Sequence, residues 1–357
     1  MKCDLILLTW NHIETTKRCL DSIFTHTDFP CRLIIVDNGS DQPGAKEYLQ
    51  TVKPGRDIQD VVYLRNEEDL GFSKGMNTGI RFCLLRQTAD YVCLVSNDAV
   101  VSKGWLSELM QVAMNNSTIG LVNPNSTNFG FYPPVSHGQK INEYGITISR
   151  SFKGQWQELG SCIGFCMLVK RAVFKKVGLF DETYGMAYYE DADLSKRAQK
   201  AGYWCALAQG SYVYHEQGES FGKHQEKSPL FLRNEEIFYS RWNMAKPQRI
   251  SYILTTQNTL TLNSISQKIR ELANQFNKIW ILYPHKILNP DTIPNHWNVQ
   301  KIPFRGPSFL FRYGSLIYLL TKKKKFDTIF VDSPHAMLFL KNSQKKYQKE
   351  FQLLGGK

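Results

Sequence analysis

The sequence predicts an α/β protein with a mostly parallel central sheet that helices cover on both faces. Apolar segments at 4–8, 32–36, 61–64 and 91–95 lack polar alternation, which is typical of buried strands. Helical segments separate these strands, and polar or acidic residues follow each of them. Parallel sheets of this kind bind ligands at the carboxyl ends of their strands, so we expect a site at that edge.

The first helix is predicted for 13–24, because Cys19, Leu20 and Ile23 fall on one face. It lies between the first two strands, as the alternating pattern requires. The polar groups that follow the four strands are Thr9, Asn11, Asp37, Asn66, Asn97 and Asp98.

A glycine-rich segment, 70–80, separates the third and fourth strands and begins a helix that is predicted to end near Arg86. Glycines at 71, 75 and 79, with Ser73 and Lys74, could bind a phosphate at the helix N-terminus. The spacing matches neither the dinucleotide-binding fingerprint nor the P-loop. Taken alone, the segment is better explained as a turn followed by a tightly packed helix.

Three carboxylates, Glu190, Asp191 and Asp193, precede a helix whose apolar residues recur at 194, 198 and 201. Acidic residues often only cap a helix. Capping needs one acid, however, and the aromatic residues before these three indicate a pocket wall. Burial beside aromatic rings raises the proton affinity of a carboxylate, which suits a general base.

The composition is that of a globular protein, with 42% hydrophobic and 21% charged residues among 357. The chain shows neither a secretory signal nor a run of about 20 apolar residues that could span a membrane, so we expect a cytoplasmic protein. All eight cysteines lie at or before Cys205, and we expect reduced core residues rather than disulfides or a zinc site.

The positive charge is concentrated in the last third of the chain. Residues 246–357 contain 18 Lys and Arg against 5 Asp and Glu, a net charge of +13, which leaves −1 for residues 1–245. This step predicts two domains, 1–245 and 246–357. Because no nucleic-acid-binding signature accompanies the charge, we expect no nucleic-acid partner.

The C-terminal segment is predicted to form a separate, small Rossmann-like α/β unit. Strands are expected at 250–255, 278–283 and 326–331, and helices at 265–276 and 308–324. The last helix is apolar and ends in Lys322–Lys325. The favoured interpretation is a helix packed on the core of this unit. The alternative is a helix that lies on the inner face of an anionic membrane.

Taken in order, these motifs resemble the inverting family-2-type glycosyltransferases of GT-A fold over about residues 3–225. The resemblance is greatest to bacterial rhamnosyl-, N-acetylglucosaminyl- and glucosyl-transferases that build surface polysaccharides. The C-terminal unit is similar to the start of the N-terminal half of a GT-B glycosyltransferase, which would make the chain a piece of a longer polypeptide or leave it a degenerate second module. The motifs that carry the first resemblance are 9–11, 36–40, Asn66, 71–79, 97–98, 164–171, 177–181, 190–191 and 214–215.

The resemblance implies a nucleotide-diphosphate sugar as donor, UDP- or dTDP-linked, and a glycan or lipid-linked glycan as acceptor. Asp37 would bind the base, and Asp191 would be the general base. Glu190 would orient either the acceptor or the helix start, and Asp193 would serve helix electrostatics. Other residues implied in binding the nucleotide-sugar are Thr9, Asn11, Asn66, Gly71, Lys74, Asn77 and Asn97.

Asp98 would hold a divalent cation, Mn²⁺ or Mg²⁺, that neutralises the departing diphosphate. The family's usual pair of aspartates is replaced here by Asn97-Asp98, so a second ligand is needed. His215 is a candidate for it, with a structural, hydrogen-bonded histidine as an equal alternative.

Two other functions compete with this interpretation. A sugar nucleotidyltransferase uses a similar sheet but needs a glycine- and Lys/Arg-rich loop after the first strand, and residues 9–12 do not supply it. The other competitor is a non-catalytic module that binds a sugar nucleotide or acts as a scaffold.

Overall fold

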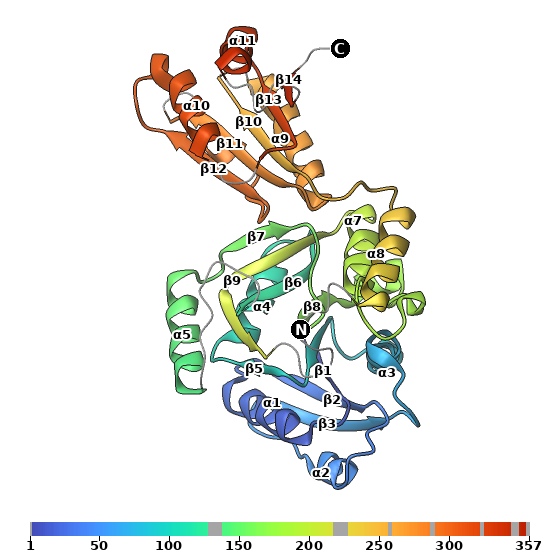
Figure 1. The fold of residues 1–357 in the computed structure, drawn as a ribbon. Coiled ribbons are helices and arrows are strands. Elements are labelled where there is room, and N and C mark those ends of the chain that lie inside the picture. The colour runs from blue at the N-terminus through green and yellow to red at the C-terminus, as the bar shows by residue number, and fades with distance from the viewer. Residues whose placement is uncertain are drawn as a thin grey trace. The chain divides into compact units, whose positions relative to one another are not determined.

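The computed structural model describes residues 2–127, 138–216, 228–255, 259–285, 290–321, 325–343 and 350–354. The chain forms two compact units (Figure 1). Unit 1 comprises Met1–Gln157 and Ser161–Trp242, and unit 2 comprises Glu158–Gly160 and Asn243–Lys357. The division falls three residues before the expected Ala245, and unit 2 also takes in a short segment from the first part of the chain.

That segment belongs to unit 2 because of its hydrogen bonds. The N–H of Glu158 donates to the carbonyl of Asn295 at 2.9 Å, and the N–H of Trp297 donates to the carbonyl of Glu158 at 2.8 Å. The Glu158 carboxylate is buried and accepts from Arg270 at 2.9 Å. Pairing between residues so far apart in the sequence leaves no local signal that could predict it.

Unit 1 is built on one large mixed sheet with the order β3-β2-β1-β4-β8-β6-β9-β5, and β7 also pairs with β9. Strands β1 to β4 are parallel, whereas β8 runs antiparallel to β4 and to β6. The mostly parallel α/β class is therefore confirmed. The strands are β1 (Cys3–Thr9), β2 (Cys31–Asp37), β3 (Ile58–Arg65), β4 (Tyr91–Ser96), β5 (Ala99–Val101), β6 (Ile119–Ser126), β7 (Trp156–Leu159), β8 (Cys166–Lys170) and β9 (Trp204–His215).

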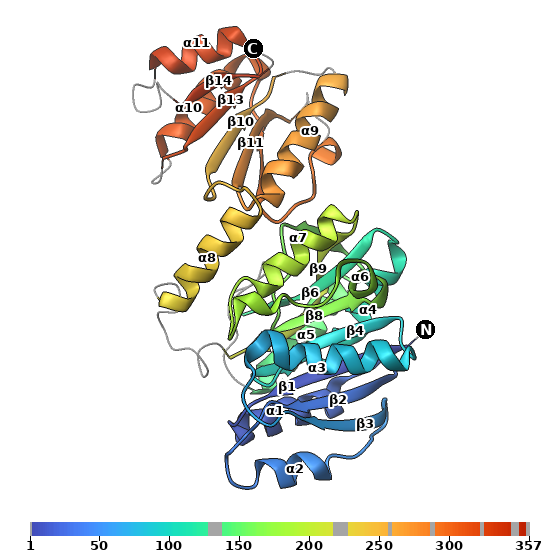
Figure 2. The ribbon, with the colours of Figure 1, turned by 90° about the vertical axis from the view of Figure 1, so that its right-hand side faces the viewer.

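Helices cover both faces of this sheet (Figures 1 and 2). Helices α1 and α4 pack on one face, where Leu20 and Trp105 join Leu5 and Leu33 in the main apolar core. Helices α3, α6 and α7 cover the opposite face, and they lie in front of the sheet in Figure 2. The helices are α1 (Ile13–His26), α2 (Ala45–Thr51), α3 (Gly71–Arg86), α4 (Trp105–Asn115), α5 (Gly138–Ser151), α6 (Arg171–Val177), α7 (Glu190–Lys200) and α8 (Pro229–Arg241).

The glycines of α3 allow close packing. A Cβ on Gly79 would lie 2.8 Å from Cγ2 of Ile6, and a Cβ on Gly71, whose φ is +72°, would lie 2.7 Å from the Cα of Met186. Side chains at these positions would push the helix away from its neighbours. Tight packing therefore explains the spacing of these glycines, in agreement with the interpretation of the segment as a turn followed by a tightly packed helix.

Strand β1 lies between β2 and β4, so the strand order reverses there, and this is where open α/β sheets bind ligands. Thr9 lies opposite Asp37 in the β1–β2 register, and Leu8 lies opposite Ser96 in the β1–β4 register. The predicted strand ends therefore do meet at one edge.

Unit 2 is a five-stranded parallel sheet with the order β12-β11-β10-β13-β14. Its helix α9 packs on one face, through Ile265 and Ile269. Helices α10 and α11 pack on the other face, through Phe311 and Leu340. The elements are β10 (Arg249–Ile253), α9 (Thr259–Asn274), β11 (Lys278–Pro284), β12 (Val299–Phe304), α10 (Phe311–Thr321), β13 (Thr328–Val331), α11 (Pro334–Ser343) and β14 (Phe351–Leu353).

Unit 2 has the α/β character predicted from the sequence, but β12, α11 and β14 were not predicted, and the apolar helix is shorter at both ends than expected. Residues Lys322–Lys324 of the basic run lie outside the described residues. Among the helices that the structure describes, none is long and apolar enough to cross a bilayer.

Candidate active site

Asp98 and His215 meet at the end of the sheet. Strand β5 pairs antiparallel with β9, which sets Ala99 opposite His215. As a result, Oδ2 of Asp98 lies 3.3 Å from Nε2 of His215. The imidazole also stacks on the ring of Phe165, with centroids 4.5 Å apart and planes 15° from parallel. The structure thus holds both side chains in a defined orientation.

The other oxygen of the same carboxylate, Oδ1 of Asp98, is buried and has no hydrogen-bond partner among the described residues. A buried carboxylate oxygen without a donor is costly, so it is typically completed by a ligand. Mg²⁺ and Mn²⁺ are held by one or two protein groups together with phosphate oxygens of the substrate. Asp98 and His215 fit such a site, although no cluster of three or more His, Cys, Asp or Glu occurs in the part of the chain that the structure describes.

Asp191 is the second residue of α7, and its carboxylate contacts the segment before β8. Its Oδ2 accepts the N–H of Gly164 at 2.9 Å, and its Oδ1 accepts the N–H of Ala192 at 2.6 Å. Burial raises the pKa of Asp191, and these two N–H donors oppose the rise in pKa. A carboxylate with a raised pKa that stays hydrogen-bonded and half-buried suits a general base.

Gly164 and Phe165 join these two parts of the site. Gly164 donates to Asp191, while the ring of Phe165 stacks on His215. The carbonyl of Phe165 accepts the N–H of Ser96 at 2.8 Å, two residues before Asp98. One dipeptide therefore fixes the candidate base relative to the candidate cation ligands. The sequence placed this segment in the family motif but did not indicate its linking role.

Glu190 is buried more deeply than its neighbour. It is 5% exposed, and its Oε2 has no hydrogen-bond partner within the described residues. Burial, and then the nearby charge of Asp191, raise the pKa of Glu190 well above its usual range. Its deep burial at the first position of α7 favours a role in supporting the helix start over direct contact with an acceptor.

Replacing Glu190 by Gln should stabilise the protein at pH 8 by on the order of 1 kcal/mol, because it removes a carboxyl group whose pKa is higher in the folded state than in the unfolded state. The folded-state pKa of Glu190 is raised, so its contribution to stability falls as pH rises above the unfolded value. We therefore expect the gain at pH 8 to vanish near pH 4. Urea unfolding of both proteins at the two pH values measures it, and an equal gain at both would contradict the assignment.

The loop before α7 is held in a strained conformation. Tyr188 and Tyr189 have φ values of 73° and 72°, in the left-handed region that bulky residues rarely adopt. The buried amide of Asn234, on α8, donates to the carbonyls of Tyr184, Ala187 and Tyr188 at 2.6, 2.7 and 3.2 Å. Strain maintained by surrounding contacts is typical of functional sites. Asn234 thus positions the start of α7.

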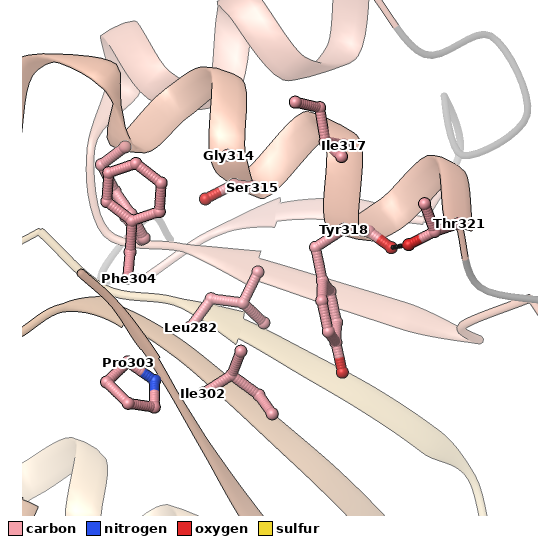
Figure 3. Close-up of a pocket in the computed structure, with 10 residues that line it drawn as sticks. Leu282, Ile302, Pro303, Phe304, Gly314, Ser315, Ile317, Tyr318 and Thr321 are labelled. Carbon is pink, nitrogen blue, oxygen red and sulfur yellow. Dashed lines mark hydrogen bonds between the residues drawn. The ribbon is translucent and has the colours of Figure 1, made fainter. Parts of the chain in front are cut away.

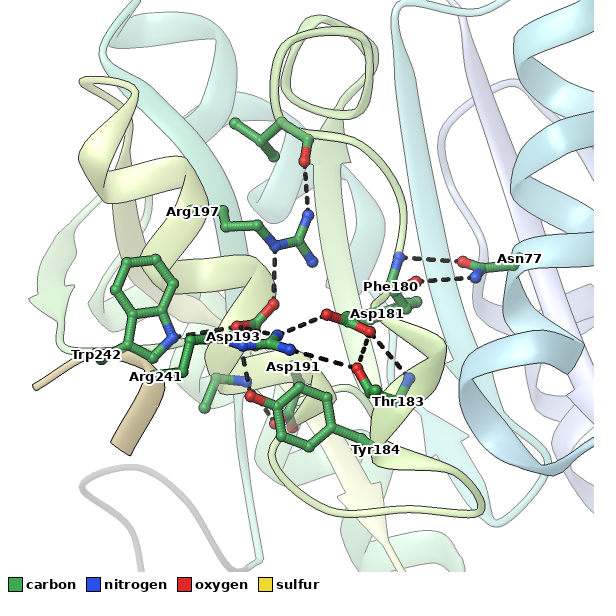
Figure 4. A network of polar contacts seen from close by, with 12 residues as sticks. Asn77, Phe180, Asp181, Thr183, Tyr184, Asp191, Asp193, Arg197, Arg241 and Trp242 are labelled. Atoms are coloured by element: carbon green, nitrogen blue, oxygen red, sulfur yellow. Dashed lines mark hydrogen bonds and ion pairs between the residues drawn. The ribbon is translucent and has the colours of Figure 1, made fainter. Parts of the chain in front are cut away.

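Asp193 is the centre of a buried polar network (Figure 4). Its carboxylate, which is fully buried, pairs with Nε of Arg197 at 2.8 Å and with Arg241 at 3.2 Å. It also accepts from Nε1 of Trp242 at 3.1 Å. The expectation that Asp193 serves only helix electrostatics is wrong, because it ties α7 to the end of α8.

The base-binding role predicted for Asp37 needs revision. Its side chain is completely buried, and it accepts from the N–H of Ser40 at 2.9 Å and the hydroxyl of Tyr63 at 2.8 Å. Arg65 pairs with the same carboxylate. The carboxylate of Asp37 is therefore already bound by donors from β3 and from the loop after β2.

The other nucleotide-binding candidates divide into two groups. Thr9, Asn66 and Asn97 lie at the strand-end edge, where the amide of Asn97 donates to the hydroxyl of Thr16 at 3.0 Å. Asn77 does not reach this edge, since its buried amide exchanges two hydrogen bonds with the backbone of Phe180 at 3.0 and 3.1 Å (Figure 4). It also donates to the carboxylate of Glu182 at 3.0 Å. We correct its role to a structural one.

Three further candidates lie around this edge. Asn11 links the loops after β1 and β2, accepting from the N–H of Asp41 and of Gln42 at 3.0 and 2.9 Å. Gly71 starts α3, and Lys74 is exposed on its first turn. The amide of Asn66 donates to Asn38 at 2.8 Å. These contacts connect the loops that would surround a nucleotide.

Comparison with known proteins settles the family. Residues 4–178 match the model of glycosyl transferase family 2. They form a family 2 glycosyltransferase domain. The predicted GT-A assignment and the enzyme class are thereby confirmed for this domain, which contains Asp98, Gly164 and Phe165, while α7 and His215 follow it.

Two curated relatives share 24% identity with the chain. One, an uncharacterized protein of Sinorhizobium fredii, matches over 73% of this chain, which covers only 30% of that protein's length. The other is the N-acetylglucosaminyl-diphospho-decaprenol L-rhamnosyltransferase of Mycobacterium tuberculosis, with 67% of this chain and 85% of the relative covered. The solved structure of a mannosyltransferase of Pyrobaculum calidifontis, in complex with GDP-Man and Mn²⁺, is 17% identical in sequence, with a TM-score of 0.45. The alignment covers 61% of this chain and 57% of the mannosyltransferase chain.

Proposed function

We propose that the chain transfers a sugar from a nucleoside-diphosphate donor to a hydroxyl group of a glycan or lipid-linked acceptor, with inversion at the anomeric carbon. The observation that carries this proposal is the Gly164–Phe165 dipeptide. Gly164 donates to the carboxylate of Asp191, and Phe165 stacks on His215, the neighbour of Asp98. An inverting transfer needs a base and a stabilised leaving group on opposite faces of one carbon.

In this mechanism the acceptor oxygen attacks the anomeric carbon as its proton passes to Asp191. The bond between that carbon and the diphosphate breaks in the same step, and the electron pair leaves with the diphosphate. The N–H of Gly164 keeps the carboxylate of Asp191 aimed at the acceptor. The raised pKa of Asp191 makes it a better proton acceptor than an exposed aspartate.

Asp98 and His215 would hold a divalent cation, Mn²⁺ or Mg²⁺, in contact with the diphosphate. Such a cation neutralises the charge that develops on the leaving group. The proposal is supported by the buried, unpartnered Oδ1 of Asp98 among the described residues. Arg65, held by Asp37 at the strand-end edge, would face the nucleoside.

The choice of acceptor follows from the relatives. The Mycobacterium protein is named for transfer to a sugar on a diphospho-decaprenol carrier. Another relative, 23% identical and from Haloferax volcanii, is named as a hexosyltransferase of low-salt glycan biosynthesis. We therefore propose a glycan acceptor on a lipid carrier, in polysaccharide biosynthesis.

A panel of UDP-, dTDP- and GDP-sugars, incubated with the protein, Mn²⁺ and a lipid-linked disaccharide acceptor, tests the function. We expect one donor to release its nucleoside diphosphate in step with product formation, and NMR of the product to show the inverted anomer. Retention of configuration would contradict the mechanism. Tight donor binding without any diphosphate release would instead support a sugar-nucleotide-binding module.

The Asp98→Asn variant tests the proposed cation site while keeping a side chain of the same size. We expect Mn²⁺ to tighten nucleoside-diphosphate binding to the parent protein at least about tenfold, and to leave the variant's binding unchanged. Calorimetric titration with and without Mn²⁺ measures both. Asp60→Asn, at an exposed position of β3, is the matched control and should behave as the parent. An undiminished Mn²⁺ effect in Asp98→Asn would exclude this ligand.

A further inference from the structure

Apart from Arg312 in its first turn, helix α10 of unit 2 carries mostly apolar side chains on both its buried and its exposed face. Phe311 and Leu319 are buried against the sheet. On its outer face Tyr313, Ile317 and Leu320 are 45%, 61% and 59% exposed, and Phe309, just before the helix, is 75% exposed. The spacing of 313, 317 and 320 places these three side chains in one stripe. A helix at a water-facing surface normally has a polar outer face, so this stripe indicates a binding surface.

The charges around this stripe are of one sign. Residues 292–326 contain seven Lys and Arg and no Asp or Glu. Of these, Arg305 and Arg312 are described and exposed, one before the helix and one within its first turn, whereas the exposed Lys325 pairs with Glu350. The guanidinium of Arg312 lies 5.1 Å from the ring centroid of Tyr313. Apolar side chains are thus next to cations that no acid of this segment neutralises.

A cavity lies behind the same helix (Figure 3). It has a volume of about 370 Å³ and is lined by α10 together with residues of β11 and β12, among them Leu282, Ile302 and Phe304. Ile317 and Thr321, on its rim, are exposed, so the cavity opens beside the apolar stripe. Its volume is in the range of small-molecule sites, and its lining suits an aliphatic chain. The Ser315 hydroxyl at its wall is buried and lacks a hydrogen-bond partner among the described groups.

We propose that α10 docks unit 2 on an anionic lipid bilayer. Tyr313, Ile317 and Leu320 enter the boundary between headgroups and acyl chains, Arg305 and Arg312 face the lipid phosphates, and the cavity behind α10 receives an aliphatic chain. The combination of an exposed apolar face with flanking cations matches a helix that lies in a membrane interface. This surface is independent of the transfer chemistry, and it would keep the protein beside a lipid-linked acceptor.

Co-sedimentation of the full chain with vesicles of phosphatidylcholine, with and without phosphatidylglycerol, tests the proposal. We expect binding to the anionic vesicles only, weakened by salt. Each exposed cation at an anionic surface contributes about fivefold in affinity, so Arg305→Ser with Arg312→Ser should weaken binding by about 25-fold. Ile317→Ser with Leu320→Ser should weaken it by at least about tenfold, because the apolar side chains no longer insert.

Controls use exposed residues of unit 1. Leu85→Ser removes an exposed leucine and Arg56→Ser an exposed arginine, both distant in the sequence from α10. Both variants should bind vesicles as the parent does. All four positions that are changed on α10 and its flank are exposed, so circular dichroism should show folded variants. Equal binding to neutral vesicles, or unchanged binding by both α10 variants, would overturn the proposal.

Two further results would also overturn it. If the parent is a dimer that Ile317→Ser with Leu320→Ser converts to monomers, the stripe is an interface between copies of the chain. If RNA competes away all vesicle binding while the apolar variant binds RNA as the parent does, the surface recognises nucleic acid through charge alone.

Discussion

Replacing Asp191 by Asn should lower kcat by about 10²–10⁴-fold and leave donor binding within about twofold, since the variant loses only the proton acceptor. Asn has the same shape as Asp, and its one oxygen can still accept the N–H of Gly164, while its amide NH2 then faces the N–H of Ala192 and that hydrogen bond is lost. Circular dichroism and urea unfolding of the variant should therefore accompany the assay, to show that the start of α7 stays folded. A single-turnover transfer assay and calorimetric donor binding measure the two quantities.

The pH dependence of the rate gives a second, independent measurement. A general base works only when it is deprotonated, and the pKa of Asp191 is raised by burial. The rate of the parent should thus rise with pH through that raised pKa, and the residual rate of Asp191→Asn should lack this limb. Asp60→Asn, at an exposed position, is the control and should keep both rate and profile. A variant that retained more than about a tenth of the parent kcat would show that another group takes the proton.

Most of the catalytic edge could be predicted from the sequence because its residues follow strands. A buried parallel strand has a continuous apolar signature, and the residue after it must lie at the carboxyl edge of the sheet. Thr9, Asp37 and Asp98 were located by this rule, and the register confirms that Thr9 lies opposite Asp37. Asp191 was located by a different signal, an excess of acids at a helix start beside aromatic residues.

The hydrogen bonds made by these residues could not be predicted in the same way. Asp37 follows its strand as expected, but the pairing with Arg65 depends on how β2 and β3 align, which apolar patterns do not specify. The hydrogen bond of Asn77 could not be predicted either, because its partner Phe180 is 103 residues away along the chain. A polar residue on a predicted helix can face a ligand or another loop, and only the packed structure distinguishes the two.

Among the elements that the sequence analysis does not predict, helix α8 matters most to the candidate site. Ser228 followed by Pro229 is a typical helix start, and the Ser228 side chain does accept the N–H of Phe231 at 3.1 Å. That signal predicts a helix but says nothing of its neighbour. Asn234 and Arg241 contact α7 and its loop through tertiary packing, so their importance is visible only in the structure.

Asp193 provides the strictest test of how α8 supports the site. We expect Asp193→Asn to lower the free energy of unfolding by about 3 kcal/mol, because Arg197 and Arg241 lose a fully buried anionic partner. The amide is similar in size, so no cavity contributes. Urea unfolding measures the change. Asp181→Asn is the matched control, since Asp181 pairs with the same Arg241 at 2.5 Å but is about one-third exposed, and its loss should cost less than about 1 kcal/mol.

The same variant should also slow transfer, because α7 carries Asp191 and is tied to α8 through Asp193 (Figure 4). Asp193 does not touch the reacting atoms, so it acts by positioning: kcat should fall while the pH profile keeps the limb that belongs to Asp191. Loss of that limb would make Asp193 part of the proton-transfer step. Equal destabilisation by Asp193→Asn and Asp181→Asn would contradict the claim that burial makes the Asp193–Arg241 pair the stronger of the two.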